Sequence, residues 1–117
     1  MKHRTLRFAH GFRVVLSNQH AQVAEMIIKA GDSEGDPTNR HHGADQWLYV
    51  VAGSGVAFVN GKRTRLKRGT LVLIERGDRH EIKNTGRRPL TTLNYCNPPA
   101  YTRSGTRCLP CAVAEFV

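Results

Sequence analysis

The sequence predicts an all-β fold, a double-sheet jelly-roll barrel, and two observations favour it. Short runs rich in apolar and β-branched residues recur along the chain, and Gly, Asn, Asp or Pro separates each run from the next. No stretch shows the 3.6-residue repeat of apolar positions that a helix needs. Eight or nine short strands joined by glycine-rich turns are typical of two packed sheets.

The individual strands are predicted from the runs between turn signals. They cover residues 12–17, 22–29, 47–51, 56–59, 63–66, 71–74, 79–83 and 90–96. Asn18-Gln19 turns the first strand into the second, and Asn60-Gly61 is a strong two-residue hairpin signal because both positions need a positive φ angle. Residues 31–40 are dense in turn formers and carry Pro37, so they are predicted to form a loop at a rim or lid.

The strand around Trp47 shows which side chains share the interior. Side chains alternate along a strand, so if Gln46 points inward, Leu48 and Val50 do too, and Trp47 and Tyr49 face outward. A Trp and a Tyr on one outer face are too apolar to leave in water. We therefore expect another layer or a second subunit there, and predict a homodimer.

Length and charge restrict the class of protein. At 117 residues the chain is expected to be one domain, residues 1–117, with residues 102–117 as a C-terminal tail. Lys and Arg number 18 against 9 acidic residues, a net charge of +9, which attracts anions. The basic residues are scattered over turns and strand edges and form no stripe, which favours solvated strand faces over a nucleic-acid partner.

The ends of the chain carry weaker signals. The basic N-terminal stretch has no long apolar core of the kind found in signal peptides, and no stretch reaches membrane-spanning length. Three cysteines, an odd number, indicate reduced thiols and a cytoplasmic location. Cys108 and Cys111 form a lone Cys-x-x-Cys, which is a weak zinc or redox signal, and the apolar ending is expected to lie against the barrel or a partner.

Two stretches, residues 39–55 and 69–84, carry imidazoles close to predicted turns. In the second, Gly69, Gly77, His80 and Asn84 match the second motif of the cupin superfamily at full spacing, with Glu75 where a proline is usual. In the first, Gln46 stands at the position of the cupin glutamate, six residues before Gly53, and the dipeptide His41-His42 lies near the histidine pair. The chain resembles a small single-domain cupin over roughly residues 12–99.

The resemblance implies a divalent metal site inside the barrel, and the first motif departs from it. With a three-residue spacer His42 takes the second histidine position and Arg40 the first; with a four-residue spacer His41 takes the second and Asn39 the first. Parity with Gln46 favours His42, although a bulge would restore His41. Gln46 offers a neutral carbonyl oxygen in place of a carboxylate, which disfavours tight metal binding.

Two functions are compatible with these residues. The first is a metal-binding cupin in which His41 or His42, Gln46 and His80 hold Mn, Fe, Zn or Ni for a dioxygenase, isomerase or lyase reaction. The second is a non-catalytic barrel that holds a small anionic or sugar-like ligand with a weak metal or none. In both, Arg40 and Leu48 are candidate ligand contacts, and an inward Arg40 would favour an anion.

No catalytic residue can be assigned from the sequence. Beyond the histidines no general base is identifiable, because Asp45 has the wrong parity and Glu75 lies in a predicted turn. Blander roles compete for two of the site residues. Gln46 could be a core amide satisfied by backbone groups, and His80 a hydrogen-bonded strand histidine.

Overall fold

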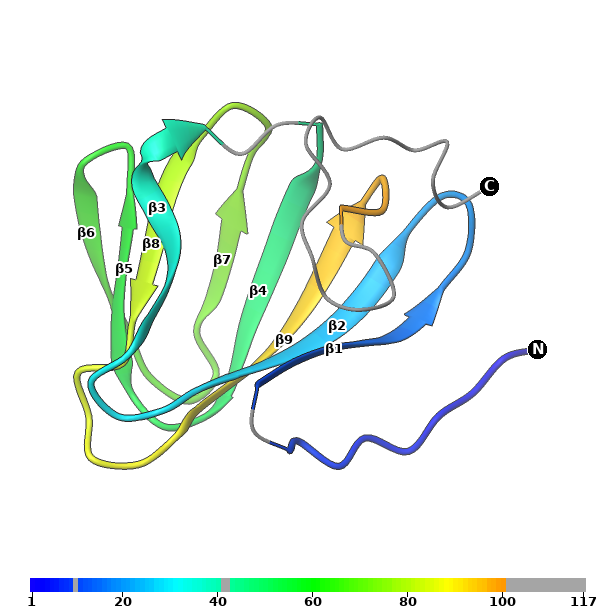
Figure 1. The fold of residues 1–117 in the computed structure, drawn as a ribbon, viewed down its shortest axis with the longest axis horizontal. Helices are drawn as coiled ribbons and strands as arrows, with labels where there is room; N and C mark the ends of the chain where they lie inside the picture. The colour runs from blue at the N-terminus through cyan, green and yellow to red at the C-terminus, as the bar shows by residue number, and fades with distance from the viewer. Residues whose placement is uncertain (10, 41–42, 101–117) are drawn as a thin grey trace.

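The computed structural model describes residues 1–9, 11–40 and 43–100, and these residues form two antiparallel sheets with no helix (Figure 1). The strands are β1 (Gly11–Ser17), β2 (Gln22–Ile28), β3 (Ser33–Arg40), β4 (Asp45–Ala52), β5 (Gly55–Val59), β6 (Lys62–Leu66), β7 (Leu71–Ile74), β8 (Arg79–Lys83) and β9 (Leu90–Asn97). One sheet has the order β1-β2-β9-β4-β7 and the other β3-β8-β5-β6. The predicted all-β architecture is confirmed.

Most strand boundaries follow the turn signals of the sequence. Val59 pairs with Lys62 across Asn60 and Gly61, whose φ angles of 51° and 80° confirm the predicted hairpin. β7 and β8 begin and end at the predicted residues. Glycine and asparagine therefore set these turns because they tolerate a positive φ angle at low cost.

Residues 31–40 differ from the sequence prediction, which made them a loop. From Ser33 onward they form β3, which pairs with β8 from Ser33↔Lys83 to Asp36↔His80 and then shifts register before Arg40↔Arg79. Pairing across the sheet outweighs the local turn preference, since β8 offers a free edge of backbone hydrogen-bonding groups. The turn-forming residues are accommodated by that irregular register.

The hydrophobic core lies between the two sheets, where alternate side chains of each strand face inward. On β4, Gln46, Leu48 and Val50 are buried, whereas Trp47 and Tyr49 are 41% and 43% exposed, as the alternation predicts. The apolar core residues are Met26, Ile28, Leu48, Val50, Ala57, Leu66, Ile74, Ile82 and Leu90. Both sheets contribute to this cluster, which therefore holds them together.

The outer face of the five-stranded sheet is apolar over its β4, β7 and β9 strands. Its exposed residues are Trp47, Tyr49, Leu71, Leu73 and Tyr95. Trp47 pairs with Leu73 on one side and with Tyr95 on the other, so these side chains form one continuous surface, here called the aromatic face. None of the five is charged.

The N-terminal residues are tied to the other end of the same sheet. The Phe8 backbone N–H donates to the Glu25 carboxylate at 3.1 Å, and the Arg13 guanidinium makes an ion pair with it, also at 3.1 Å. Glu25 is 1% exposed, so these two contacts offset much of the desolvation of its charge. Within the described residues there is no helix of the length and hydropathy that a membrane crossing requires.

Candidate functional site

Gln46 lies on the inner face of β4 and is 2% exposed. Its side-chain nitrogen Nε2 donates to Oδ1 of Asn94 on β9 at 2.8 Å. Asn94 Nδ2 donates to Thr92 Oγ1 at 3.0 Å, and the Thr92 hydroxyl donates to the backbone carbonyl of Met26 on β2 at 2.8 Å. Three adjacent strands, β4, β9 and β2, are thus joined by a polar chain inside the barrel, here called the amide relay.

The carbonyl oxygen of Gln46 is the open end of this relay. Gln46 Oε1 is buried and has no hydrogen-bond partner among the described residues. A buried polar atom left unsatisfied costs about 1–3 kcal/mol, and native proteins keep few of them. Gln46 Oε1 is therefore placed to accept from a hydrogen-bond donor, or to face a cation, inside the barrel.

His80 enters the interior from the opposite sheet. It lies near the start of β8, is 3% exposed, and shares its inward parity with Ile82 and Asn84, as the sequence predicts. Asn84 donates through Nδ2 to the backbone carbonyls of Ile28 and Arg88, both at 2.8 Å, so this motif position closes a turn. His80 is the imidazole that the described residues place inside the barrel.

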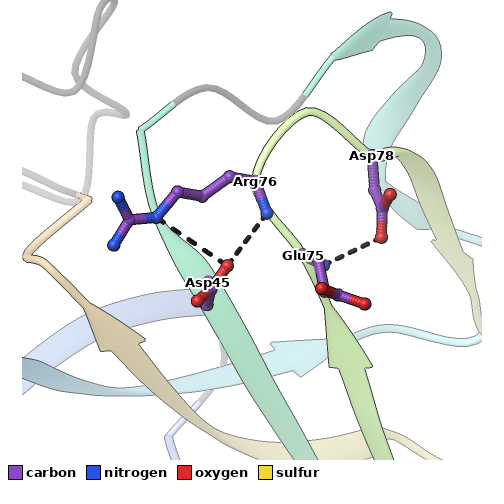
Figure 2. Close-up of polar contacts among 4 residues, drawn as sticks. All are labelled: Asp45, Glu75, Arg76 and Asp78. Carbon is purple, nitrogen blue, oxygen red and sulfur yellow. Dashed lines mark hydrogen bonds and ion pairs between the residues drawn. The ribbon is translucent and has the colours of Figure 1, made fainter.

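The turn before His80 is fixed by two carboxylates, which Figure 2 shows. Asp45 Oδ1 accepts from the Arg76 backbone N–H at 3.0 Å and lies 3.8 Å from the Arg76 guanidinium. Asp78 accepts from the Glu75 backbone N–H at 2.8 Å and, with its other oxygen, from Asn60 Nδ2 at 2.8 Å. The carboxylates of Asp45 and Asp78 therefore hold the turn, and Glu75 contributes its backbone N–H to it.

Gln46 and His80 come from facing sheets at one end of the barrel. Gln46 is in register with Ile74, the last residue of β7, and a four-residue turn from Glu75 to Asp78 leads from there to β8. In Figure 1 this turn joins the ends of β7 and β8 on the side where β4 begins. The interior between these two side chains is the candidate site.

The other predicted site residues are placed in part. Leu48 is fully buried in the hydrophobic core. Arg40 ends β3, where it pairs with Arg79 of β8, at the same end of the barrel as His80. His41 and His42 lie outside the described residues, as do Cys108 and Cys111.

The described residues do not by themselves fit a tightly bound divalent ion. They contain no group of three His, Cys, Asp or Glu side chains that could hold a metal. Gln46 and His80 supply two neutral ligands, and one histidine from the pair at 41 and 42 would make three without adding a negative charge. A dication there would keep its full charge in a buried setting, which is costly.

Sequence reasoning missed Thr92, Asn94 and Gly35. The signal for the first two was present, because both lie between Leu90 and Cys96 in a strand whose even-numbered residues face inward. Polar residues at inward positions of a strand call for partners. Gly35 escaped because its segment was interpreted as a loop, whereas it lies on β3 opposite β8.

The fold defines the chain as a β-barrel whose interior holds the candidate site, and comparison with known proteins gives the family. A family model described as the cupin domain matches residues 24–96. The chain belongs to the cupin family, as the motif resemblance implied. The motif anchors from Gln46 to Asn84 all lie within the matched residues.

Three similar proteins illustrate the range of the family. The tetracenomycin polyketide synthase protein TcmJ of Streptomyces glaucescens is 34% identical over 73 residues, which are 62% of this chain and 49% of that protein. The oxalate-binding protein of Thermotoga maritima is 32% identical over 78 residues, 67% of this chain and 63% of that protein. The chain thus spans about half to two thirds of these relatives. A solved structure from Bacillus halodurans superposes with a TM-score of 0.70 at 26% identity, covering 92% of this chain and 84% of the other.

Proposed function

We propose that this cupin domain binds a small molecule inside the barrel, between Gln46 and His80. The observation that carries the proposal is the buried Gln46 Oε1, which has no hydrogen-bond partner among the described residues. An acceptor left in this state loses about 1–3 kcal/mol, and a ligand that donates to it recovers that loss. His80, buried on the facing sheet, supplies a second polar wall.

The comparisons support a ligand of small size. The relative from Thermotoga maritima is named as an oxalate-binding protein, and it is 32% identical to this chain over 78 residues. Small-molecule sites are mostly apolar with a few placed polar groups, which describes an interior of Leu48 and Ile82 with Gln46 and His80. The three cysteines, an odd number, support a reducing cytoplasmic setting for this protein.

A metal-binding function is the second candidate, and one observation favours it. Gln46 and His80 stand at motif positions that resemble the metal ligands of cupins, and the structure brings them to the same end of the barrel. The ion would be Mn, Fe, Zn or Ni, held together with His41 or His42. Gln46 and His80 add no negative charge to offset that of the ion. The proposed binding of a small molecule therefore does not rely on a metal.

Binding of small probes tests the proposal. Oxalate, oxamate and glucose are titrated into ¹⁵N-labelled protein, and the side-chain signals of Gln46 and His80 are followed by NMR. We expect at least one probe to shift both signals. In Gln46→Leu only the His80 signal is left to follow, and we expect the same probe no longer to shift it. Glu81→Gln, the outward neighbour of His80 on β8, is the matched control and should bind as the wild type does. Shifts confined to the outer surface, or no shift with any of the three probes, would contradict the proposal.

We also propose that a second copy of the chain covers the aromatic face. Five large apolar side chains are exposed there, and a second copy of the chain would remove them from water. A two-fold interface places the same patch on both subunits, and this patch is apolar enough to be self-complementary. Trp and Tyr are the residues that most often dominate such interfaces.

A further inference from the structure

The amide relay has a direction, and its starting point is the backbone carbonyl of Met26. A carbonyl oxygen can only accept, so the hydroxyl proton of Thr92 must point to it at 2.8 Å. The Thr92 oxygen then has only lone pairs to offer to Asn94, 3.0 Å away. The Asn94 group facing Thr92 is therefore the NH₂ group.

The same logic fixes Gln46. With its NH₂ turned to Thr92, Asn94 presents its carbonyl oxygen to Gln46, and an oxygen can be approached only by a donor. The Gln46 NH₂ group fills that role at 2.8 Å. Gln46 Oε1, the buried atom without a partner among the described residues, is therefore turned away from Asn94. A flipped amide would bring two carbonyl oxygens together, so this orientation is the stable one.

We propose that Thr92 and Asn94 are positioning residues that hold the acceptor atom Oε1 of Gln46 turned away from Asn94, so that the barrel selects ligands carrying a hydroxyl or N–H donor over bare carboxylates. The proposal rests on the proposed function and names the ligand class of that same site. Thr92 and Asn94 are 0% exposed and Gln46 is 2% exposed, so little water competes for the orientation. The surface charge attracts anions at long range, whereas a ligand inside the barrel meets Gln46 Oε1 as a hydrogen-bond acceptor.

Hydrogen exchange of the Gln46 side-chain amide tests the positioning role without any ligand. In Thr92→Val the methyl group preserves the shape and removes the hydroxyl, so Asn94 loses its fixed orientation. We expect the Gln46 NH₂ protons to exchange at least about tenfold faster, which corresponds to about 1.4 kcal/mol. Thr92→Ser keeps the hydroxyl and should stay near the wild-type rate. Equal exchange in Thr92→Val and Thr92→Ser would overturn the positioning role, even if the valine variant were less stable.

A pair of isosteric probes tests the ligand class on the wild-type full chain. Oxamate has the skeleton of oxalate with one carboxylate replaced by an amide, and so carries a donor that oxalate lacks at neutral pH. In buffer with EDTA we expect oxamate to bind about tenfold more tightly than oxalate, and Gln46→Leu to remove that preference. Oxalate binding as tightly as oxamate at Gln46 would overturn the ligand class. If neither probe shifts the Gln46 signal, the proposed ligand class is wrong, and so is the proposal that the site binds a molecule of the size of oxalate. The hydrogen-exchange experiment still decides whether Thr92 and Asn94 position Gln46.

Discussion

Gly35 on β3 pairs with Glu81 of β8, and it lies so close to the neighbouring His80 that there is no room for a side chain. A Cβ atom placed on Gly35 would lie 2.7 Å from the backbone oxygen of His80 and 3.2 Å from both Cδ2 and Nε2 of its ring. Gly35 also has a φ angle of 90°, in the region that L side chains rarely adopt. Because Gly35 has no side chain, the His80 imidazole has room inside the barrel next to β3.

The first prediction concerns Gly35→Ala. We expect it to lower the free energy of unfolding by about 2 kcal/mol or more, because it adds a steric clash to the cost of the φ angle. Gly31→Ala is the matched control: its φ angle is 85°, but nothing lies within 4 Å of an added Cβ, so it should lose only about 1 kcal/mol. Urea denaturation measures both, and the His80 ring signals in NMR should move only in Gly35→Ala. Equal losses would show that His80 yields to the added methyl group.

The second prediction concerns assembly through the aromatic face. We expect the wild type to be a dimer at micromolar concentration, and Trp47→Ser to weaken dimerisation by about 2 kcal/mol or more, since Trp is a frequent hot spot. Arg63→Ser, an exposed position on β6 in the other sheet, should leave the dimer intact. Sedimentation or light scattering reports the mass. A wild-type monomer, or a dimer indifferent to Trp47→Ser, would exclude this face as the interface.

The third prediction concerns the positive charge. Arg63 and Arg65 line a groove of about 610 Å³ with Ser54 and Thr85, and neither arginine has an ion pair with a described residue. If these arginines are only solvated surface residues, duplex DNA should bind weakly, and the binding should be lost once the salt concentration reaches the physiological level. Fluorescence anisotropy at increasing salt measures this. Sequence-selective binding that persists above physiological salt would instead establish a nucleic-acid partner.

Local turn chemistry explains how much of the fold could be predicted. Asn60-Gly61 defines a hairpin because the backbone requirement and the residues coincide, and alternation then places Leu48 and Val50 inside. β3 could not be predicted in this way. Its residues prefer turns locally, and only pairing with β8, far away in the sequence (Ser33 with Lys83, Asp36 with His80), makes them a strand.

The candidate site was predictable in its anchors and not in its connections. Motif spacing and parity place Gln46 and His80 inside, and both are buried. What Gln46 bonds to could not be inferred, because Asn94 lies 48 positions further along and the relay ends on a backbone carbonyl that no sequence pattern marks. The sequence allowed Gln46 to be a core amide that backbone groups satisfy. In the structure its Nε2 instead donates to the side chain of Asn94, and its Oε1 has no hydrogen-bond partner among the described residues.

The last prediction separates a metal site from a ligand site and uses Gln46→Glu. Without metal, the carboxylate is buried and cannot donate to Asn94 Oδ1, so the free energy of unfolding should fall by about 1–3 kcal/mol. The same change adds the anionic oxygen that the native donor set lacks. If Gln46 and His80 face one site, we expect the affinity for Mn²⁺ or Zn²⁺ to rise at least about tenfold, or about 1.4 kcal/mol.

Two further variants make that result specific. Gln19→Glu adds the same charge at an exposed turn and should leave metal affinity unchanged. Gln46→Glu combined with His80→Ala should lose the gain, because one carboxylate with at most one imidazole holds such an ion poorly. Calorimetry on chelator-stripped protein measures the affinity, and a metal-dependent rise in Tm gives an independent readout. A buried carboxylate that faces a metal site attracts a dication. If neither Gln46→Glu nor its combination with His80→Ala changes the metal affinity, both residues are therefore excluded from any metal site.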